Sequence, residues 1–432
     1  METQSEAIYM ILQNSSLAKV MVISTIDLES KSSAMYSRLL NYCRAMNALG
    51  VDVHISSMKF SKIFLKQPNK DLITEQFKHK EIRSQSQIYR MLFKEVDLIV
   101  TSKYLKQIMK YCEEHEIDRV FVCTENFALT LLALFYSKIY RKIAVIEKNE
   151  LAIANRVNYQ FPDAILARIL SVPILMVDSV LMIFRDFAAL FYDGVIAIST
   201  RLDGVYSRLS NKTIVRIPIL CNPNQNSLYD PSCKEQSKSS FDICYAGMIT
   251  EKKDMLIDLC ELMDDEELKS MNCRLHIYGN ASKVSAKLLG IGVKKETRFE
   301  NVFYYGVIPN AELVEKYHSY DLLVMLRKKS MQAQFGFSTK LAEYLMSGVP
   351  VLTTDVSDVE MFLDNRKSAY ILKCVDYNKE NLKTLLKFIL KDQNRIGVGL
   401  AGKEVALTNF DPLNYLSQFE KVFSLSTGHQ CD

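Results

Sequence analysis

The sequence predicts an α/β protein made of two doubly wound domains that face each other. Apolar, strand-like runs alternate with helical patterns along most of the chain. These runs are apolar throughout, which is typical of parallel strands covered by helices on both faces. A polar, turn-rich stretch interrupts the alternation after Asn222, and a second series of the same kind follows it. Two domains of similar architecture are therefore expected.

The first series predicts six strands, and the segments between them are long enough for right-handed helical crossovers. These strands are expected at 19–25, 51–56, 97–101, 119–123, 142–146 and 194–199. The second series predicts six more, at 241–247, 274–279, 302–306, 321–326, 349–352 and 369–372. We expect an N-terminal domain over 1–222, a C-terminal domain over 223–408 and a final helical segment over 409–432.

The composition is that of an ordinary globular protein, since 48% of the 432 residues are hydrophobic and 24% are charged. The formal net charge of +4 is small for this length, which argues against a nucleic-acid-binding protein. The ten cysteines include no C-x-x-C pair and lie in apolar stretches, which indicates buried, reduced thiols of a cytoplasmic protein. The N-terminal residues lack a basic region followed by an apolar one, which argues against export.

Two segments bear on contact with a membrane. The most apolar stretch, 164–192, is interrupted by charged residues, so no transmembrane helix is expected. The interrupting residues are Arg168, Asp178, Arg185 and Asp186. The segment 59–94 carries nine Lys or Arg against three acids, interleaved with aromatic residues. It would either lie on an anionic leaflet or form an ordinary solvated face.

The most informative segment runs from Phe335 to Asp355 and has the pattern of a loop, a short helix and a buried strand. Ser338 or Thr339 would cap the helix, and Gly348 would end it. The unpaired N–H groups at a helix start, together with a dipole worth roughly half a positive charge, suit an anion such as a phosphate. The segment therefore predicts a phosphate site.

Glu343 lies one turn into this helix, where a carboxylate can accept both hydroxyls of a ribose. The segment resembles the donor-binding signature of the retaining family-four glycosyltransferases, also called glycosyl transferases group 1. There, two glutamates separated by a glycine-rich turn hold a nucleotide sugar. Glu343 matches the second glutamate, but Phe335 stands at the first, so one sugar contact is missing or comes from elsewhere. The resemblance implies donor-binding roles for Phe335, Gly336, Phe337, Ser338, Thr339, Lys340, Leu341 and Glu343.

Earlier segments resemble the same family in the same order. The run Tyr245–Asp254 resembles the strand, glycine turn and lysine that open the donor domain, with Gly247 in the turn. Lys253 takes the place of that lysine, which supplies charge to a diphosphate leaving group. Met248 replaces the usual arginine. The residues that would compensate are Lys252, Arg327 and Lys340.

Two further strand ends, 275–280 and 305–310, resemble family strands that finish in glycine turns. The resemblance implies that Gly279 lies beside the donor. It also implies that the backbone of Val307 and Ile308 holds the nucleotide base. Arg327 completes this series of donor-binding elements.

The N-terminal half resembles the family only in outline, because the glycine pair expected after the first strand is replaced by 26–33. Glu147–Glu150 follows a predicted strand, at the edge where open α/β sheets bind ligands. Glu150 would orient an acceptor hydroxyl there, or it would cap a helix. Both interpretations are open.

The resemblance implies a GT-B fold and a retaining, metal-independent glycosyltransferase of the hexosyltransferase type, with Glu150 and Lys253 as catalytic residues and no cofactor. A sugar would move from a nucleotide diphosphate sugar to a sugar or lipid-linked acceptor, in bacterial surface polysaccharide or glycolipid synthesis. The protein would act in the cytoplasm, at the inner face of the cell membrane. The absence of a D-x-D pair agrees with metal independence. The alternatives are a nucleotide-sugar epimerase of the same fold and a catalytically silent nucleotide-sugar-binding protein.

The last predicted helix lies over 409–423, with Asp411 as its cap and Pro412 in its first turn. In proteins that resemble this one, the final helix crosses back over the cleft, so its apolar stripe should contact residues before Asn222. The alternative is a last helix of the C-terminal domain that packs only on its own sheet. The stripe repeats every three or four residues and consists of Leu413, Leu416, Phe419 and Phe423.

Overall fold

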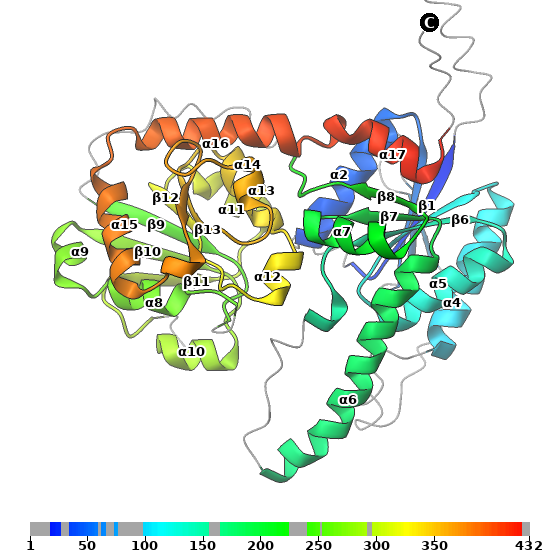
Figure 1. Ribbon diagram of the computed structural model, residues 1–432, viewed down its shortest axis with the longest axis horizontal. Coiled ribbons are helices and arrows are strands. Elements are labelled where there is room, and N and C mark those ends of the chain that lie inside the picture. The colour runs from blue at the N-terminus through cyan, green and yellow to red at the C-terminus, as the bar shows by residue number, and fades with distance from the viewer. Residues whose placement is uncertain are drawn as a thin grey trace, which may run out of the picture.

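The structure is a computed structural model that describes residues 18–26, 34–58, 62–65, 73–76, 98–154, 165–223, 240–250, 253–291 and 296–425. These residues form two α/β domains that lie side by side, each with a central sheet and flanking helices (Figure 1). Most of the expected linker after Asn222 lies outside the described residues, as do the side chains of the basic segment 59–94.

The N-terminal sheet has eight strands in the order β4-β3-β2-β1-β5-β6-β7-β8. Its parallel strands are β1 (Lys19–Ser24), β2 (Asp52–Ser57), β5 (Arg119–Cys123), β6 (Ile143–Lys148), β7 (Gly194–Ala197) and β8 (Thr213–Arg216). An antiparallel extension consists of β3 (Lys62–Leu65) and β4 (Ile73–Gln76). The helices of this domain are α2 (Ala34–Ala48), α4 (Leu98–Glu114), α5 (Phe127–Ile139), α6 (Ile165–Ala188) and α7 (Thr200–Leu209).

The strand expected at 97–101 is wrong, because α4 begins at Leu98. Its apolar residues continue at helical spacing, and Tyr104, Leu105, Ile108 and Cys112 are all buried on one side of α4. A short apolar run cannot by itself distinguish a strand from the first turn of a buried helix. The other five strands expected in this domain are confirmed, whereas β3, β4 and β8 were not predicted.

The C-terminal sheet is parallel, with the order β11-β10-β9-β12-β13-β14, and its six predicted strands are confirmed. They are β9 (Phe241–Ala246), β10 (Cys273–Tyr278), β11 (Val302–Gly306), β12 (Leu322–Met325), β13 (Val351–Thr354) and β14 (Tyr370–Leu372). The helices are α8 (Leu256–Leu262), α9 (Glu266–Ser270), α10 (Lys283–Leu289), α11 (Asn310–Tyr317), α12 (Met331–Phe335), α13 (Thr339–Met346), α14 (Val359–Phe362), α15 (Lys379–Lys391) and α16 (Arg395–Phe410).

In both sheets the strand order changes direction once. The strands that follow β1 or β9 in sequence first add on one side of it and later on the other, so the change falls between β1 and β5 and between β9 and β12. Such switch points open a crevice at the carboxyl ends of the strands, where open α/β sheets bind ligands. The cysteines also behave as expected, since the eight described ones are free and all but Cys374 are buried.

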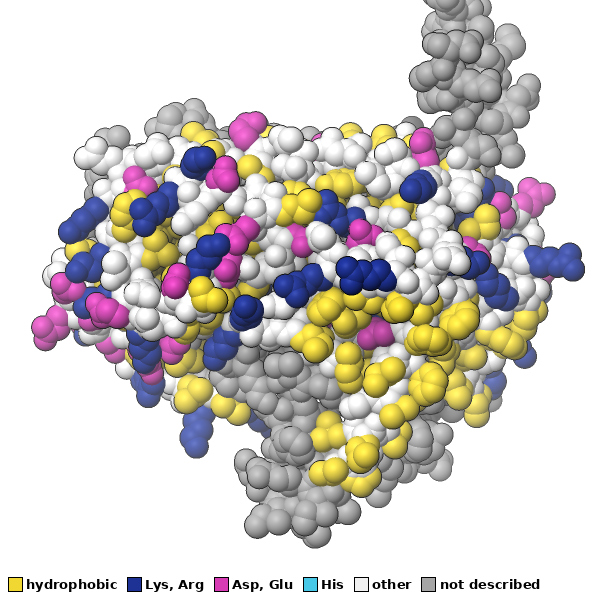
Figure 2. Space-filling view, in the orientation of Figure 1, with side chains coloured by type: hydrophobic (Ala, Val, Ile, Leu, Met, Phe, Trp, Pro, Cys, Tyr) yellow, Lys and Arg dark blue, Asp and Glu magenta, His cyan; other side chains and the backbone are white. Residues whose placement is uncertain are grey.

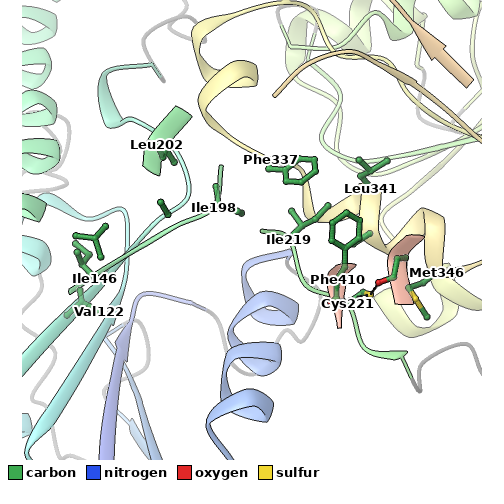
Figure 3. Close-up of a cluster of buried hydrophobic side chains, with 14 of the residues drawn as sticks. Val122, Ile146, Ile198, Leu202, Ile219, Cys221, Phe337, Leu341, Met346 and Phe410 are labelled. Atoms are coloured by element: carbon green, nitrogen blue, oxygen red, sulfur yellow. Dashed lines mark hydrogen bonds between the residues drawn. The ribbon is translucent and has the colours of Figure 1, made fainter. Parts of the chain in front are cut away.

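One apolar core continues from the first domain into the second (Figure 3). Ile198, after β7, and Ile219, after β8, lie on the N-terminal side of this core, and Phe337 and Leu341 lie on the C-terminal side. Phe410, the last residue of α16, packs between the two sides, with its ring 6.1 Å from that of Phe337.

The chain crosses between the domains twice, and the two crossings touch. The backbone N–H of Cys221 donates to the carbonyl of Phe410 at 2.8 Å. Beyond this point, α17 (Leu416–Phe423) packs on α2, β7 and β8 of the N-terminal domain (Figure 1). The Phe419 ring lies 5.7 Å from that of Tyr42, and the Phe423 ring lies 5.4 Å from that of Phe121.

The final helix differs from its sequence-based prediction at its start. Leu413 lies in a 3₁₀ turn over Pro412–Tyr415 and is 50% exposed, so it does not belong to the buried stripe. Asp411 caps this turn, since its carboxylate accepts the N–H of Leu413 at 2.9 Å. The buried residues of α17 are Phe419, Val422 and Phe423.

We predict that Phe419→Ala lowers the free energy of unfolding of the protein by about 3–5 kcal/mol, because the ring is fully buried against the N-terminal core. Chemical denaturation followed by circular dichroism measures this. Leu413→Ala is the matched control and should change the same free energy by no more than about 0.5 kcal/mol. Equal effects of the two substitutions would mean that α17 does not anchor the chain on the N-terminal domain.

Candidate active site

The candidate active site is a cavity of about 230 Å³ between the two domains, at the carboxyl edges of both sheets. Arg38 of α2 lines it on the N-terminal side, together with Asn149 and Glu150, which follow β6. Loops after β9 and β12 and the start of α13 line it on the other side.

The cavity gathers many of the predicted site residues but not all of them. Those that line it are Glu150, Gly247, Lys253, Arg327, Gly336, Phe337, Ser338, Thr339 and Lys340. Those outside its lining are Gly279, Val307, Ile308, Phe335, Leu341 and Glu343.

Four cationic side chains line the cavity: Arg38, Lys253, Arg327 and Lys340. Burial lowers the pKa of the Lys253 ammonium from its usual value, and the neighbouring Arg327 lowers it further. The Nε atom of Arg327 is buried and has no hydrogen-bond partner among the described residues. Clustered, partly desolvated cations repel one another, so this cavity is suited to an anion with several negative oxygens.

Backbone hydrogen bonds place Lys253 beside Arg327. The N–H of Lys328 donates to the Lys253 carbonyl at 3.0 Å, and the N–H of Met255 donates to the Leu326 carbonyl at 2.8 Å. The segments 253–255 and 326–328 therefore lie against each other at the β9 and β12 ends. Tyr245 fixes the buried carboxylate of Asp254 with a hydrogen bond of 2.6 Å. Burial raises the pKa of that carboxyl group, and Arg327 acts in the opposite direction.

The start of α13 forms the floor of the cavity. Ser338 is the N-cap residue, but its hydroxyl does not accept a helix N–H as expected. It accepts instead from Nη2 of Arg327 at 3.1 Å. The Ser338 side chain therefore does not cap the start of α13. Phe337 to Lys340 line the cavity, so the unpaired N–H groups at this helix start lie beside the cations.

Glu343 is buried one turn below this floor, beneath Lys340. Its Oε2 atom has no hydrogen-bond partner among the described residues. Burial raises the pKa of this carboxyl group from its usual value, and Lys340 acts in the opposite direction. A buried acceptor without a partner is rare, because it loses the free energy of a hydrogen bond. It fits a ligand that brings hydroxyl donors to this point.

Phe335 does not face the cavity, although it stands at the position of the first family glutamate. Its side chain packs on the interdomain core, and its carbonyl accepts from the Ser199 hydroxyl at 2.6 Å. Met248, which stands at the usual arginine position, lines the cavity and is 68% exposed. Arg327 and Lys340 line the same cavity and supply positive charge there, whereas Lys252 lies outside the described residues.

Glu150 connects the two domains across the cavity, because its Oε2 atom accepts from Nε2 of Gln332 at 3.0 Å. Asp186 of α6 holds the loop that carries Glu150. Its carboxylate accepts from Nζ of Lys148 at 2.7 Å and from the N–H of Ala152 at 3.0 Å. Glu150 is therefore fixed from both the N-terminal and the C-terminal side.

Glycines allow the strand ends of the C-terminal sheet to approach each other closely. The N–H of Gly247 donates to the Tyr278 carbonyl at 2.9 Å, and that of Gly279 donates to the Gly306 carbonyl at 2.7 Å. Gly279 has φ +127°, and a Cβ atom there would lie 1.8 Å from the Gly247 oxygen. A side chain at position 279 would therefore displace Gly247, which lines the cavity.

Sequence reasoning missed Arg38 and Gln332 as lining residues. Arg38 lies in a helix with an ordinary apolar pattern, and its ion pair of 2.5 Å with Glu147 becomes visible only in three dimensions. Gln332 precedes the recognised segment by three residues and carries no motif of its own. Asn149, by contrast, lies inside the Glu147–Glu150 run that sequence analysis had identified. Among the described residues, no three His, Cys, Asp or Glu side chains are grouped so as to hold a metal ion.

Known proteins resemble this chain at two levels. Residues 240–392 match the family model of Glycosyl transferases group 1, so the expected family resemblance is confirmed for the C-terminal domain. At the level of the whole sequence, none of the curated proteins matches.

Solved structures share the fold of nearly the whole chain. Sucrose-phosphate synthase from Thermosynechococcus elongatus is 14% identical with a TM-score of 0.65, and the match covers 95% of this chain and 100% of that one. HepE of Anabaena, in complex with UDP-glucose, is 13% identical with a TM-score of 0.60, and the match covers 94% and 99%. A trehalose-6-phosphate protein from E. coli bound with UDP-2-fluoro glucose is 12% identical with a TM-score of 0.60, and the match covers 95% and 100%. The protein has the GT-B fold, as its sequence predicted.

We predict that Glu343→Gln stabilises the unliganded protein at neutral pH by about 1–3 kcal/mol, because it replaces a buried carboxylate that has no partner for Oε2. The raised pKa means that the folded protein holds this proton more tightly than the unfolded chain. The parent should therefore match the variant below the usual pKa of 4.5 and lose stability relative to it as the pH rises through the folded-state value.

Unfolding free energies of both proteins, measured across this pH range, test the prediction. Glu315→Gln, at an exposed position of the same domain, is the control and should show no such pH-dependent difference. If the difference in unfolding free energy between the parent and Glu343→Gln did not change with pH, burial would not destabilise the charged form of Glu343.

Proposed function

We propose that the protein is a retaining glycosyltransferase that moves a sugar from a nucleotide diphosphate sugar to an acceptor hydroxyl in the interdomain cleft. The observation that carries this proposal is the convergence of Lys253, Arg327, Lys340 and the start of α13 on one cavity. A diphosphate leaving group needs this kind of positive environment as its charge develops. The family match over 240–392 and the GT-B fold support the same activity.

The donor diphosphate would lie at the start of α13, between Lys253 and Arg327. Glu343 would accept the ribose hydroxyls, which would supply the missing partner of its Oε2 atom. The base would extend along the glycine row toward Val307 and Ile308, at the end of β11. Solved relatives with bound UDP and UDP-glucose support a nucleotide sugar as the ligand.

The transferred sugar would lie on the N-terminal side of the cavity, beside Glu150 and Arg38. Glu150 would orient the acceptor hydroxyl, and the leaving diphosphate would take its proton on the same face of the sugar, so that the anomeric configuration is retained. Glu150 and Gln332 would supply the hydroxyl contacts that Phe335 does not make. Cationic side chains would balance the diphosphate charge without a metal ion.

The acceptor class proposed from the family resemblance is a sugar or a lipid-linked sugar, in bacterial surface polysaccharide or glycolipid synthesis. The protein would then act in the cytoplasm, at the inner face of the cell membrane. The basic segment 59–94 would contribute to membrane contact.

We predict that Lys253→Ala lowers kcat by roughly a hundredfold and changes donor affinity much less, because the ammonium acts mainly on charge that develops in the transition state. Steady-state kinetics with saturating donor separate the two effects. Lys283→Ala, at an exposed position of the same domain, is the control and should leave both values unchanged. If Lys253→Ala were as active as the parent protein, Lys253 would have no role in the reaction.

A panel of nucleotide diphosphate sugars, each incubated with and without candidate acceptors, tests the proposed reaction class. Release of free nucleoside diphosphate together with a glycosylated acceptor of unchanged anomeric configuration is the expected outcome. A new isomer of the nucleotide sugar would indicate an epimerase instead. Binding without any turnover would indicate a catalytically silent nucleotide-sugar-binding protein.

A further inference from the structure

One side of α6 exposes large apolar residues to solvent. Val172, Met176, Val180, Ile183, Phe184 and Phe187 are each between 45% and 66% exposed. Their spacing of three or four residues places them along one side of the helix, which we call the α6 face. Figure 2 shows a hydrophobic area over the lower part of the N-terminal domain, where Figure 1 places α6.

Two ionic groups near the C-terminal end of α6, Arg185 and Asp186, turn the other way, toward the domain. Arg185 is 4% exposed and donates to the carbonyl of Glu125. Asp186 forms an ion pair of 2.7 Å with the buried Lys148. A surface helix of a globular protein normally shows the reverse pattern, with apolar residues inside and charges outside. The C-terminal half of α6 therefore presents its apolar side to the surroundings.

The exposed apolar area extends beyond α6 itself. Phe135 and Ile139 of the adjacent α5 are 57% and 55% exposed. Phe191, just after α6, packs edge-on against Phe187 with ring centres 5.5 Å apart. Figure 1 shows α6 projecting from the body of the domain. A continuous apolar area of this kind marks an interaction surface, whereas single exposed apolar residues are ordinary.

Basic residues border this area near the C-terminal end of α6. Asp193 lies two residues after Phe191, and its Oδ1 atom is 2.5 Å from Nζ of Lys138 and 3.9 Å from Nζ of Lys212. Arg141 and Arg208 are exposed on the neighbouring segments. Figure 2 shows dark-blue Lys and Arg side chains along the edge of the hydrophobic area.

We infer that the α6 face is a membrane-docking surface, which enters the head-group region of an anionic lipid leaflet. An apolar helix side with a basic border matches the chemistry of such an interface, since apolar side chains enter the acyl boundary and Lys or Arg meet the lipid phosphates. A second copy of this chain fits less well, because a two-fold contact through this face brings the two basic borders together. Among the described residues, no helix is long and apolar enough to cross a membrane.

Docking through α6 also orients the cavity. Asp186 binds the loop that carries Glu150, so the acceptor side of the cavity is fixed to the helix that meets the lipid. An amphiphilic acceptor whose apolar chain stays in the bilayer can then present its polar end to the cavity. This second step rests on the proposed function, whereas the lipid contact does not.

Sedimentation of the full-length protein with vesicles tests the inference. The vesicles contain equal parts of phosphatidylcholine and phosphatidylglycerol, and phosphatidylcholine vesicles serve for comparison. We expect the parent to bind the anionic vesicles, and the triple variant Met176→Asn, Phe184→Ser, Phe187→Ser to bind at least about tenfold more weakly. The matched control is Val375→Ser, Ile396→Asn, Leu413→Ser, which changes three exposed apolar residues elsewhere and should bind like the parent.

Equal vesicle binding by parent and triple variant would overturn the inference. The inference would also be overturned if the parent protein bound neither kind of vesicle and instead formed a dimer that the α6 substitutions disrupt. Analytical ultracentrifugation measures this dimer. Titration of each variant with soluble nucleotide sugars gives an independent readout. The α6 substitutions should leave donor binding unchanged. A variant that binds the donor but not the vesicles has lost only its membrane contact, whereas a parent that does not bind the donor contradicts the proposed function.

Discussion

The apolar packing between the two domains is the constraint on which the rest of the structure depends. Phe410 packs against Phe337, and the crossing at Cys221 is hydrogen-bonded to the Phe410 carbonyl. Phe337 is also the residue that leads into α13, so the same side chain belongs to the interdomain core and to the wall of the cavity. Core packing therefore fixes how the two domains face each other across the cavity, where Gln332 donates to Glu150.

The cavity and the helix beneath it hold charged groups that cost stability in the unliganded protein. Lys253 and Arg327 lie side by side with their charges partly desolvated, and Glu343 is buried without a partner for one oxygen. Each feature disfavours the unliganded protein, and the proposed ligand, which combines a diphosphate with ribose hydroxyls, would relieve both. The groups that destabilise the unliganded protein are thus the ones that would bind a nucleotide sugar, and such an arrangement is characteristic of a preorganised site.

The sequence allowed most of the C-terminal domain to be predicted, because its information is local. Strands β9 and β10 end in turns at Gly247 and Gly279, and the helix start at 338–340 follows directly from residue order. The N-terminal contributions to the site depend on tertiary contacts, and Arg38 is recognisable only through its pairing with Glu147. The α6 face shows the same limit. Arg185 and Asp186 interrupt an apolar stretch in the sequence, but in the structure they turn inward and leave its outer side apolar.

A crystal structure with a bound nucleoside diphosphate tests the central claim most directly, which is that the cavity holds the donor diphosphate over the start of α13. The account predicts phosphate oxygens within about 2.7–3.2 Å of Nζ of Lys253 and of backbone N–H groups at the start of α13. It also predicts a ribose hydroxyl that donates to Glu343. Phosphates bound elsewhere in the cleft, with Glu343 still lacking a partner for Oε2, would contradict it.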